Sequence, residues 1–334
     1  MPTISVLTCT RNPDAAALTR VLTGIESLRI PAGWSREYLL IDSASTPPLG
    51  GRTDVVAFIK RNEWTSVVRC DEPGLSVARR AGIAAAKGDV LVWFDDDNVP
   101  ARDYLEHVAS TAASHPHVSV WGAGTITVEF TGPVAPWVER TMRPFFQERA
   151  HANDEFGRSN GWVSFFPVGS GLVTRRGAAA RWAESSASGR YTLTGRRGTA
   201  LSAGDDAQII FGAVAAGESV GVVARQSLTH LIPPSRCTSD YLARMEFGIS
   251  ASLRIARAEC FPAEAGVHDA DDLSMIDATR AALAALPAHG MIDGPRHARL
   301  ELARRLGALS GSLTTQHRPE PLWLRAAIQV LGLR

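Results

Sequence analysis

The sequence predicts an α/β fold with a mainly parallel central sheet flanked by helices, followed by a helical C-terminal extension. Three observations predict it: short apolar runs alternate with amphipathic stretches over the first hundred residues, 118–174 is β-rich and aromatic, and helical patterning dominates from residue 238 onward. Alternating strands and helices are typical of βα units around a parallel sheet. At 334 residues, the chain is long enough for one large domain or two closely joined lobes.

The apolar runs of the first hundred residues predict four strands and two helices. The strands are expected over 3–9, 38–41, 66–70 and 90–94. Asn12 followed by Pro13 predicts the start of the first helix, because Asn caps helices and Pro fits their first position. The Pro-, Gly- and Ser-rich stretch 43–51 predicts a loop, and 75–87 predicts a helix whose small residues let it lie close to the sheet.

Composition excludes several classes of protein. A formal net charge of +1 argues against a general nucleic-acid binder, which needs a basic face. The four cysteines are scattered without zinc-ligand spacing, which favours reduced thiols in the cytosol. We find no secretion signal at the N-terminus and no apolar run long enough to cross a bilayer, so we expect a cytoplasmic protein.

A cluster of three acids follows the fourth predicted strand. The apolar run from residue 90 leads directly into Asp95, Asp96 and Asp97, at the carboxyl end of a sheet where α/β folds place ligands. Adjacent carboxylates repel one another unless a cation or solvent compensates them, and Mg²⁺ or Mn²⁺ would bind such oxygens and bridge them to a diphosphate. The alternative is a solvated acidic turn that caps the next helix.

A second pair of acids precedes a predicted helix over 205–216. Asp205 and Asp206 stand where carboxylates meet the positive end of a helix dipole, so simple capping is one interpretation. One Asp suffices for a cap, and the second is then free to act as a general base. The residues alone leave both interpretations open.

Six short motifs then stand in a specific order along the chain. They are Ser-Val-Leu-Thr-Cys-Thr-Arg-Asn at 5–12, Leu-Ile-Asp-Ser-Ala-Ser at 40–45, Gly-Leu-Ser-Val-Ala-Arg-Arg-Ala-Gly-Ile at 74–83, Lys-Gly-Asp at 87–89, Phe-Asp-Asp-Asp at 94–97 and Gly-Asp-Asp at 204–206. Each motif is short, but the ordered set resembles family 2 glycosyltransferases of the GT-A fold, the nucleotide-diphospho-sugar transferase fold. The resemblance spans about residues 1–235.

The resemblance implies a nucleotide site at the ends of the first strands. Asp42 would hydrogen-bond the nucleotide base, and Thr8, Thr10 and Arg11 would line the same pocket. Arg79 would lie near the nucleotide or its diphosphate, in agreement with the fit of a guanidinium to phosphate.

The resemblance also gives the acids their roles. Asp95 and Asp97 match the two acids of the DxD motif, with Asp97 the metal ligand and Asp95 nearer the ribose. Asp206 matches the catalytic base of the family, while Asp96 and Asp205 are expected in the same donor site. The family often has Glu where Asp205 stands, a departure that keeps the charge.

The segment 228–236 carries a further histidine and arginine. Leu-Thr-His-Leu-Ile-Pro-Pro-Ser-Arg resembles the His-x-Ile-Pro…Arg stretch of a polysaccharide-building subgroup. The resemblance implies that His230 completes the metal site or touches the diphosphate, and that Arg236 neutralises phosphate. A histidine that merely packs beside apolar residues is the alternative.

The central stretch is rich in aromatic residues. For most of them, we expect packing in the core and not stacking on a sugar. They are Trp137, Phe145, Phe146, Phe156, Trp162, Phe165 and Phe166. Gly169-Ser170-Gly171 follows and allows either a close approach of backbone to the sugar or a simple turn.

The C-terminal third predicts helices, with 263–272 as a link between two of them. The final segment, 321–334, is apolar around most of a helix, with Arg325 and Arg334 as its charges. Three interpretations stay open: contact with the inner face of the cell membrane, docking onto the protein's own helices, or a homodimer contact.

The sequence therefore predicts an inverting, divalent-metal-dependent, hexosyltransferase-type glycosyltransferase, with inversion implied by the resemblance. It would move a sugar from a nucleotide-diphosphate donor to a glycan or lipid-linked acceptor, in surface polysaccharide or glycoconjugate biosynthesis. The expected parts are a nucleotide-sugar-binding half (1–100), an acceptor-binding catalytic half (101–236) and the helical extension (237–334). One alternative is a sugar-phosphate nucleotidyltransferase. Such an enzyme would need a Gly-rich phosphate loop after the first strand, and residues 8–12 contain no glycine. The other is a non-catalytic nucleotide-sugar-binding protein, against which both acidic clusters weigh.

Overall fold

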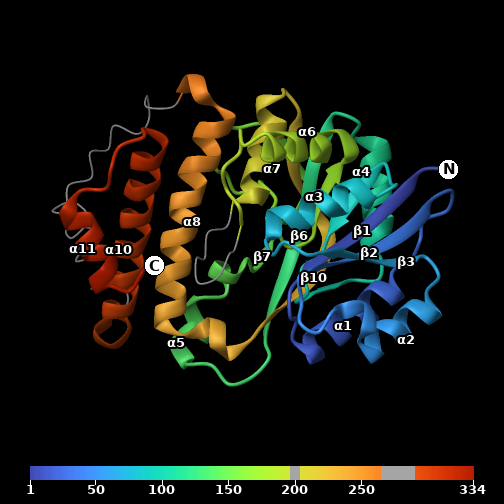
Figure 1. Cartoon of the computed structure of the whole chain (residues 1–334), viewed down its shortest axis with the longest axis horizontal. Helices are drawn as coiled ribbons and strands as arrows, with labels where there is room; N and C mark the ends of the chain where they lie inside the picture. Colours follow the sequence, from blue (N-terminus) through green and yellow to red (C-terminus); the bar gives the residue numbers. More distant parts are fainter. Residues whose placement is uncertain (196–203, 265–289) are drawn as a thin grey trace.

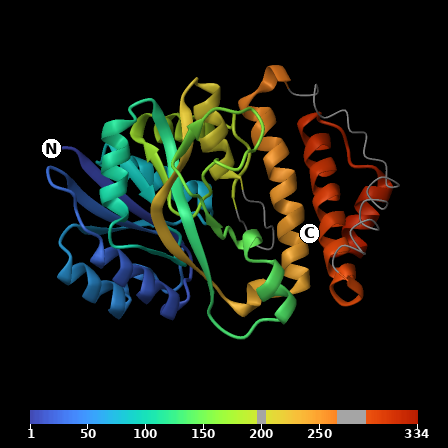
Figure 2. The same cartoon turned by 180° about the vertical axis from the view of Figure 1, so that it is seen from behind.

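The computed structural model describes residues 1–195, 204–264 and 290–334, and its centre is one twisted sheet with helices on both faces (Figures 1 and 2). In that part of the chain, ten strands form the sheet. Eight follow the order β3-β2-β1-β4-β9-β6-β10-β5, while β7 pairs with β6 and β8 with β10. The strands are β1 (Thr3–Thr10), β2 (Ser35–Ser43), β3 (Thr65–Cys70), β4 (Val90–Trp93), β5 (Asn98–Pro100), β6 (Val118–Phe130), β7 (Arg149–Ala150), β8 (Glu155–Gly157), β9 (Leu172–Arg175) and β10 (Ser219–Ile232).

The register of the sheet brings several strand ends to one edge. β1 pairs in parallel with both β2 and β4, and β2 pairs in parallel with β3. β9 is antiparallel to β4 and β6, after which β6 and β10 are again parallel. The mainly parallel α/β fold predicted from the sequence is confirmed. Because parallel strands end at the same edge, the segments that follow β1, β2 and β4 lie close together there.

Helices that precede residue 190 cover both faces of the sheet. They are α1 (Ala15–Ser27), α2 (Thr53–Arg61), α3 (Leu75–Ala85), α4 (Tyr104–Ser114), α5 (Pro136–Thr141) and α6 (Arg176–Ala187), with short 3₁₀ turns η1 (Leu49–Gly51) and η2 (Pro144–Phe146). Side chains of α1, α2 and α4 pack in the core on one face, and those of α3 and α6 pack on the other.

The expected start of the first helix at Asn12 is wrong. The N-cap of α1 is Asp14, whose Oδ1 accepts a hydrogen bond from the backbone N–H of Ala17 at 2.9 Å. Asn12 has a φ of +49° and its side chain accepts instead from the backbone N–H of Thr46 at 2.8 Å. Asn12 therefore ties the loop after β1 to the loop after β2, and the helix begins later.

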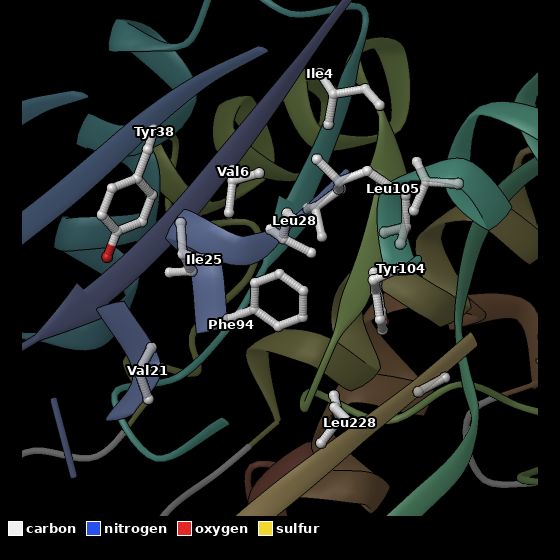
Figure 3. Close-up of a cluster of buried hydrophobic side chains, with 14 of the residues drawn as sticks. Ile4, Val6, Val21, Ile25, Leu28, Tyr38, Phe94, Tyr104, Leu105 and Leu228 are labelled. Atoms are coloured by element: carbon white, nitrogen blue, oxygen red, sulfur yellow. The ribbon is translucent and has the colours of Figure 1, made fainter. Parts of the chain in front are cut away.

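The core on the first face anchors the end of β4 (Figure 3). Phe94 packs among Ile4, Val6 and Ile25, and its ring meets that of Tyr104 edge to face with centroids 4.9 Å apart. Phe94 is 1% exposed. Since the residue before the acidic cluster is fixed in the core, the three carboxylates that follow leave the sheet at a defined point.

The second half of the chain ends in helices, which confirms the predicted helical extension. They are α7 (Asp205–Ala215), α8 (Ser239–Cys260), α10 (Gly290–Thr315) and α11 (Leu322–Val330), with turns η3 (Pro234–Cys237) and η4 (Pro262–Glu264). α10 lies along α8, and α11 packs beside α10 (Figure 1). The predicted link over 263–272 falls largely outside the described residues.

The C-terminal segment docks onto the helices of the chain itself, one of its three predicted interpretations. Leu324, Ile328 and Leu333 are buried in one cluster with Phe247 of α8 and Leu306 of α10. None of the helices within the described ranges combines the length and apolar content needed to cross a membrane. The four cysteines are free thiols, in agreement with the prediction from their spacing.

Candidate active site

A cavity of about 320 Å³ lies where β1 and β4 end and α7 begins, and we call it the edge cavity. Ten of the sequence-predicted site residues line it: Thr10, Arg11, Arg79, Asp95, Asp96, Asp97, Asp205, Asp206, His230 and Arg236. Thr8 and Asp42 do not. Two acidic clusters that are far apart in the sequence therefore meet at one cavity.

Asp97 is the most strongly held carboxylate of the first cluster. One of its oxygens accepts from Arg236 Nη1 at 2.5 Å, and the other accepts from Asn98 Nδ2 at 2.8 Å and lies 3.5 Å from His230 Nε2. Burial raises the pKa of Asp97, but His230 and Arg236 outweigh burial and hold this pKa well below its ordinary value. Asp97 is thus an anion.

Asp96 lies beside Asp97, but its pKa is shifted in the opposite direction. Its carboxylate accepts a hydrogen bond from the hydroxyl of Thr10 at the end of β1. Burial and the negative charge of Asp97 raise the pKa of Asp96 above its ordinary value.

The hydrogen bonding of His230 orients its ring toward Asp97. Nδ1 lies 3.0 Å from the carbonyl oxygen of Phe146, which only accepts, so Nδ1 carries the proton. Nε2 then faces Asp97, and in the neutral ring it presents a lone pair there. Burial lowers the pKa of His230, but Asp97 outweighs burial and raises it. This arrangement is more than packing beside apolar residues.

At the second acidic cluster, Asp205 forms a buried ion pair with Arg79 of α3. The Nη1–Oδ2 distance is 3.0 Å, and the two residues are 4% and 2% exposed. The guanidinium also lies 5.5 Å from the ring centroid of Trp93. Asp205 therefore ties the start of α7 to α3.

The neighbouring Asp206 lies in the open part of the site. Its Oδ1 accepts from the backbone N–H of Ala207 at 2.8 Å. Burial and the charge of Asp205 raise the pKa of Asp206. A Cβ atom at Gly169 would lie only 2.9 Å from Asp206 Oδ2, so the glycine makes room for the carboxylate.

Asp42 lies under the loop after β2 instead of in the cavity wall. Its oxygens accept from the backbone N–H groups of Ser45 and Leu49, both at 2.9 Å, and from Arg69 Nη1 at 2.7 Å. Burial raises the pKa of Asp42, but these hydrogen bonds outweigh it and lower the pKa overall. Thr8 is fully buried in β1. Asp42 thus shapes the loop beside the cavity.

Two cavity residues were not predicted from the sequence as polar contacts. Gln147 follows η2 with a φ of +70°, and Ser170 follows Gly169; both line the edge cavity. The side-chain oxygen of each is buried without a hydrogen-bond partner among the described residues. A buried unpaired oxygen is costly unless a ligand or water satisfies it. The glycines at 169 and 171 were a weak signal for Ser170, and Gln147 gave none.

Comparison with known proteins identifies the family. The sequence profile of glycosyl transferase family 2 matches residues 5–181. No curated protein matches the chain in sequence. The structure is similar to the mannosyltransferase PcManGT from Pyrobaculum calidifontis in complex with GDP-Man and Mn²⁺, with a TM-score of 0.53 and 16% identity over 99% of this chain and 79% of that one.

It is also similar to residues 1–349 of S. aureus TarS, with a TM-score of 0.47 and 12% identity over 96% of this chain and 93% of that one. Similarity at such low identity shows the fold alone, and with the first of these structures it agrees with the GT-A fold expected from the sequence. The family profile, in contrast, covers more than half of the chain and includes the first acidic cluster. The chain therefore belongs to glycosyl transferase family 2 and is a glycosyltransferase.

Proposed function

We propose that this glycosyltransferase moves a sugar from a nucleotide diphosphate to an acceptor hydroxyl by an inverting, divalent-metal-dependent displacement. The observation that carries the proposal is that Asp97 and Asp206, from clusters far apart in the sequence, line the same cavity. An enzyme of this kind needs both groups at one sugar: one to hold the diphosphate end and one to activate the acceptor. Nucleotide-sugar donors agree with the family assignment.

In the proposed step, Asp206 accepts the proton of the acceptor hydroxyl while the hydroxyl oxygen attacks the anomeric carbon. The new carbon–oxygen bond forms on the face opposite the diphosphate, and the bond to the diphosphate breaks with its electron pair leaving on the nucleotide. The raised pKa of Asp206 makes it a stronger base than an ordinary carboxylate. Positioning of the two reactants, without a covalent enzyme intermediate, lowers the barrier.

The lining of the edge cavity fits a divalent cation. It contains five carboxylates and three guanidinium groups, so a diphosphate would add negative charge to an already acidic surface. Asp97 and the lone pair on His230 Nε2 would hold Mn²⁺ or Mg²⁺ there, with the Phe146 carbonyl fixing the ring as such ligands require. The positive charge of the bound cation would stabilise the departing diphosphate.

Ligands for such a cation would come in part from the donor. Within the described ranges, no three histidine, cysteine or acidic side chains are already gathered as a metal site. Mg²⁺-type sites commonly use one or two carboxylates and complete their shell with substrate phosphates and water. Mn²⁺ in the complex of PcManGT with GDP-Man supports the same assignment for this chain.

The nucleotide would lie over the ends of β1 and β2. Thr10, Arg11 and the loop held by Asp42 form that side, and residues 1–100 would bind the nucleotide-sugar while 101–236 bind the acceptor. Arg79 would act through Asp205, since its guanidinium is engaged there. We place the reaction in the cytoplasm, where nucleotide-sugars are made, and in the assembly of a surface polysaccharide or glycoconjugate on a glycan or lipid-linked acceptor.

A donor screen combined with one substitution tests the proposal. Nucleotide-sugars are screened for an increase in melting temperature with Mn²⁺ or Mg²⁺, because a ligand that binds only the native state stabilises it. Asp206→Asn should keep this donor-dependent stabilisation and lose transfer. Asp240→Asn, whose side chain is 75% exposed, is the control and should keep both. Full transfer by Asp206→Asn would remove Asp206 as the base, and a wild type that binds donors without transfer would be a binding protein.

A further inference from the structure

A second cavity, of about 590 Å³, adjoins the edge cavity on the side of α8, and we call it the α8 trough. Gln147, Asp206, His230 and Arg236 line both cavities, so the two meet at the proposed base. Arg11, on the proposed nucleotide side, lines the edge cavity and is not among the residues that line the trough. A group in the trough would therefore lie beside Asp206 and apart from Arg11.

One wall of the trough is an apolar stripe of α8. Tyr241, Met245, Ile249 and Leu253 line it at a spacing of four residues, which places them on one face of the helix. Met245 is buried, whereas Ile249 and Leu253 are partly exposed toward the trough. The stripe leads from the end of α8 near Arg236 along the length of the trough.

The facing wall is also apolar. Phe145, Phe146, Trp162 and Val168 line it. Trp162 is 41% exposed, although its ring meets that of Phe166 at an angle of 78° with centroids 5.6 Å apart. A tryptophan that is fixed by neighbours and still open to the cavity is a suitable surface for an apolar group.

The charged side chains of the trough are mostly engaged by the protein. Arg149 donates to two backbone carbonyls, at 2.9 and 3.3 Å. Glu148 accepts from Arg143 at 3.1 Å, and His151 lies 3.0 Å from Glu155. Besides Asp206, the lining contains Glu246, and burial raises its pKa. A cavity of this size with such walls binds a largely apolar ligand with a few polar anchor points.

We infer that the acceptor is amphipathic: its hydroxyl lies at Asp206, and an apolar group attached to it, a lipid or aromatic aglycone, lies in the α8 trough. This inference rests on the proposed function, because it takes Asp206 as the base that receives the acceptor proton. Asp206 lines both cavities, and this connects the apolar walls to the reaction. A purely hydrophilic glycan would make little use of the apolar walls that the stripe on α8 and Trp162 form.

The test compares acceptors that differ only in the aglycone. Octyl β-glucoside below its critical micelle concentration and methyl β-glucoside are titrated calorimetrically against the full chain. The octyl compound should bind at least about tenfold more tightly. Burial of two methylene groups is enough for this difference in affinity, because each contributes ~0.8 kcal/mol. The same preference should hold for transfer across a panel of octyl and methyl glycosides, with the donor found by thermal screening.

Variants locate the binding. Ile249→Asn should weaken octyl binding about tenfold, and Ile249→Ala, which adds no polar group, should weaken it less. Leu322→Asn, at a side chain of α11 that is 78% exposed and outside the trough, is the control and should bind like the wild type. Melting temperatures show that each variant is folded.

The outcomes separate this inference from the proposed function. Equal affinity for octyl and methyl glycosides, or octyl binding that Ile249→Asn leaves intact, would overturn the amphipathic acceptor. Transfer to methyl glycosides that still needs Asp206 would then leave the proposed function standing. Absence of transfer to every acceptor despite tight octyl binding would instead overturn the proposed function and, with it, the assignment of the trough to an acceptor.

Discussion

Replacement of Gly169 by alanine tests the role of Asp206 without touching its carboxylate. Gly169 does not have a positive φ, so alanine fits the backbone at this position. Its methyl group would nevertheless lie 2.9 Å from Asp206 Oδ2, whereas ordinary contacts begin near 3.4 Å. Because Oδ1 is held by the N–H of Ala207, the carboxylate has to rotate or shift as a unit.

The size of the effect follows from that distance. The carboxylate has to retreat by roughly 0.5 Å, the tolerance within which catalytic groups have to be held. A misplacement of about 1 Å costs on the order of 100-fold in rate, so we expect Gly169→Ala to lower kcat by about 10- to 100-fold. This loss corresponds to about 1.4–2.7 kcal/mol in the activation free energy. The KM for the donor should change little, since Asp206 is proposed to act on the acceptor.

The assay is steady-state transfer, with the melting temperature as a measure of folding. Gly161→Ala is the matched control, because a Cβ atom there has only one neighbour within 4.0 Å, the hydroxyl of Ser159. It should keep the activity of the wild type. Both variants should melt close to the wild type.

A double mutant decides between an effect through Asp206 and a general disturbance. In the Asp206→Asn background, Gly169→Ala should lower the residual rate no further, because residues that act as a unit are not additive. A full second loss in the double mutant would show that Gly169 matters for another reason. Wild-type kcat in the single mutant would refute the steric reasoning altogether.

Three further outcomes are expected. The pKa of Asp206 is raised by burial and by Asp205, so kcat/KM should fall as the pH drops through a value above the ordinary carboxyl range. Asp205→Asn should move this acidic limb of the pH profile to lower pH. A limb that stays in place would contradict the coupling between the two acids. Asp97→Ala should abolish the part of the donor-dependent melting shift that needs Mn²⁺, and an equal shift with and without Mn²⁺ in the wild type would refute a metal role. Leu324→Ala should lower the free energy of unfolding in urea by about 2–5 kcal/mol. Leu322→Ala, at a 78% exposed side chain, should change it by no more than about 0.5 kcal/mol. Equal urea midpoints for the two variants would mean that the tail is not docked.

The acidic clusters could be predicted from the sequence because local pattern determines where they stand. An apolar run that ends in acids predicts a strand end, and Asp95–Asp97 do follow β4. A pair of acids before an apolar helical face predicts a helix start, and α7 begins at Asp205. In the folded chain, these two segments line one cavity. In both cases, neighbours in the sequence carry the signal.

Features that depend on distant partners could not be predicted in this way. Asn12 has the residue type of a helix cap, but its contact with Thr46, far along the chain, holds it away from the helix. The apolar face of 321–334 predicted a contact without its partner, which is α8 and α10. Likewise, the aromatic stretch did not single out Trp162, because its exposure depends on which cavity forms beside α8.

The two acidic clusters are held by arginines from opposite parts of the chain, and this crossing explains why they share a cavity. Asp97, after β4, pairs with Arg236, which follows β10. Asp205, at the start of α7, pairs with Arg79 of α3. Each pair thus links residues before 100 with residues after 200, and removal of one partner of a buried pair costs about 3–5 kcal/mol. Each link therefore holds an acidic cluster to an element from the other end of the chain, beside the cavity that the proposed metal ligand and the proposed base share.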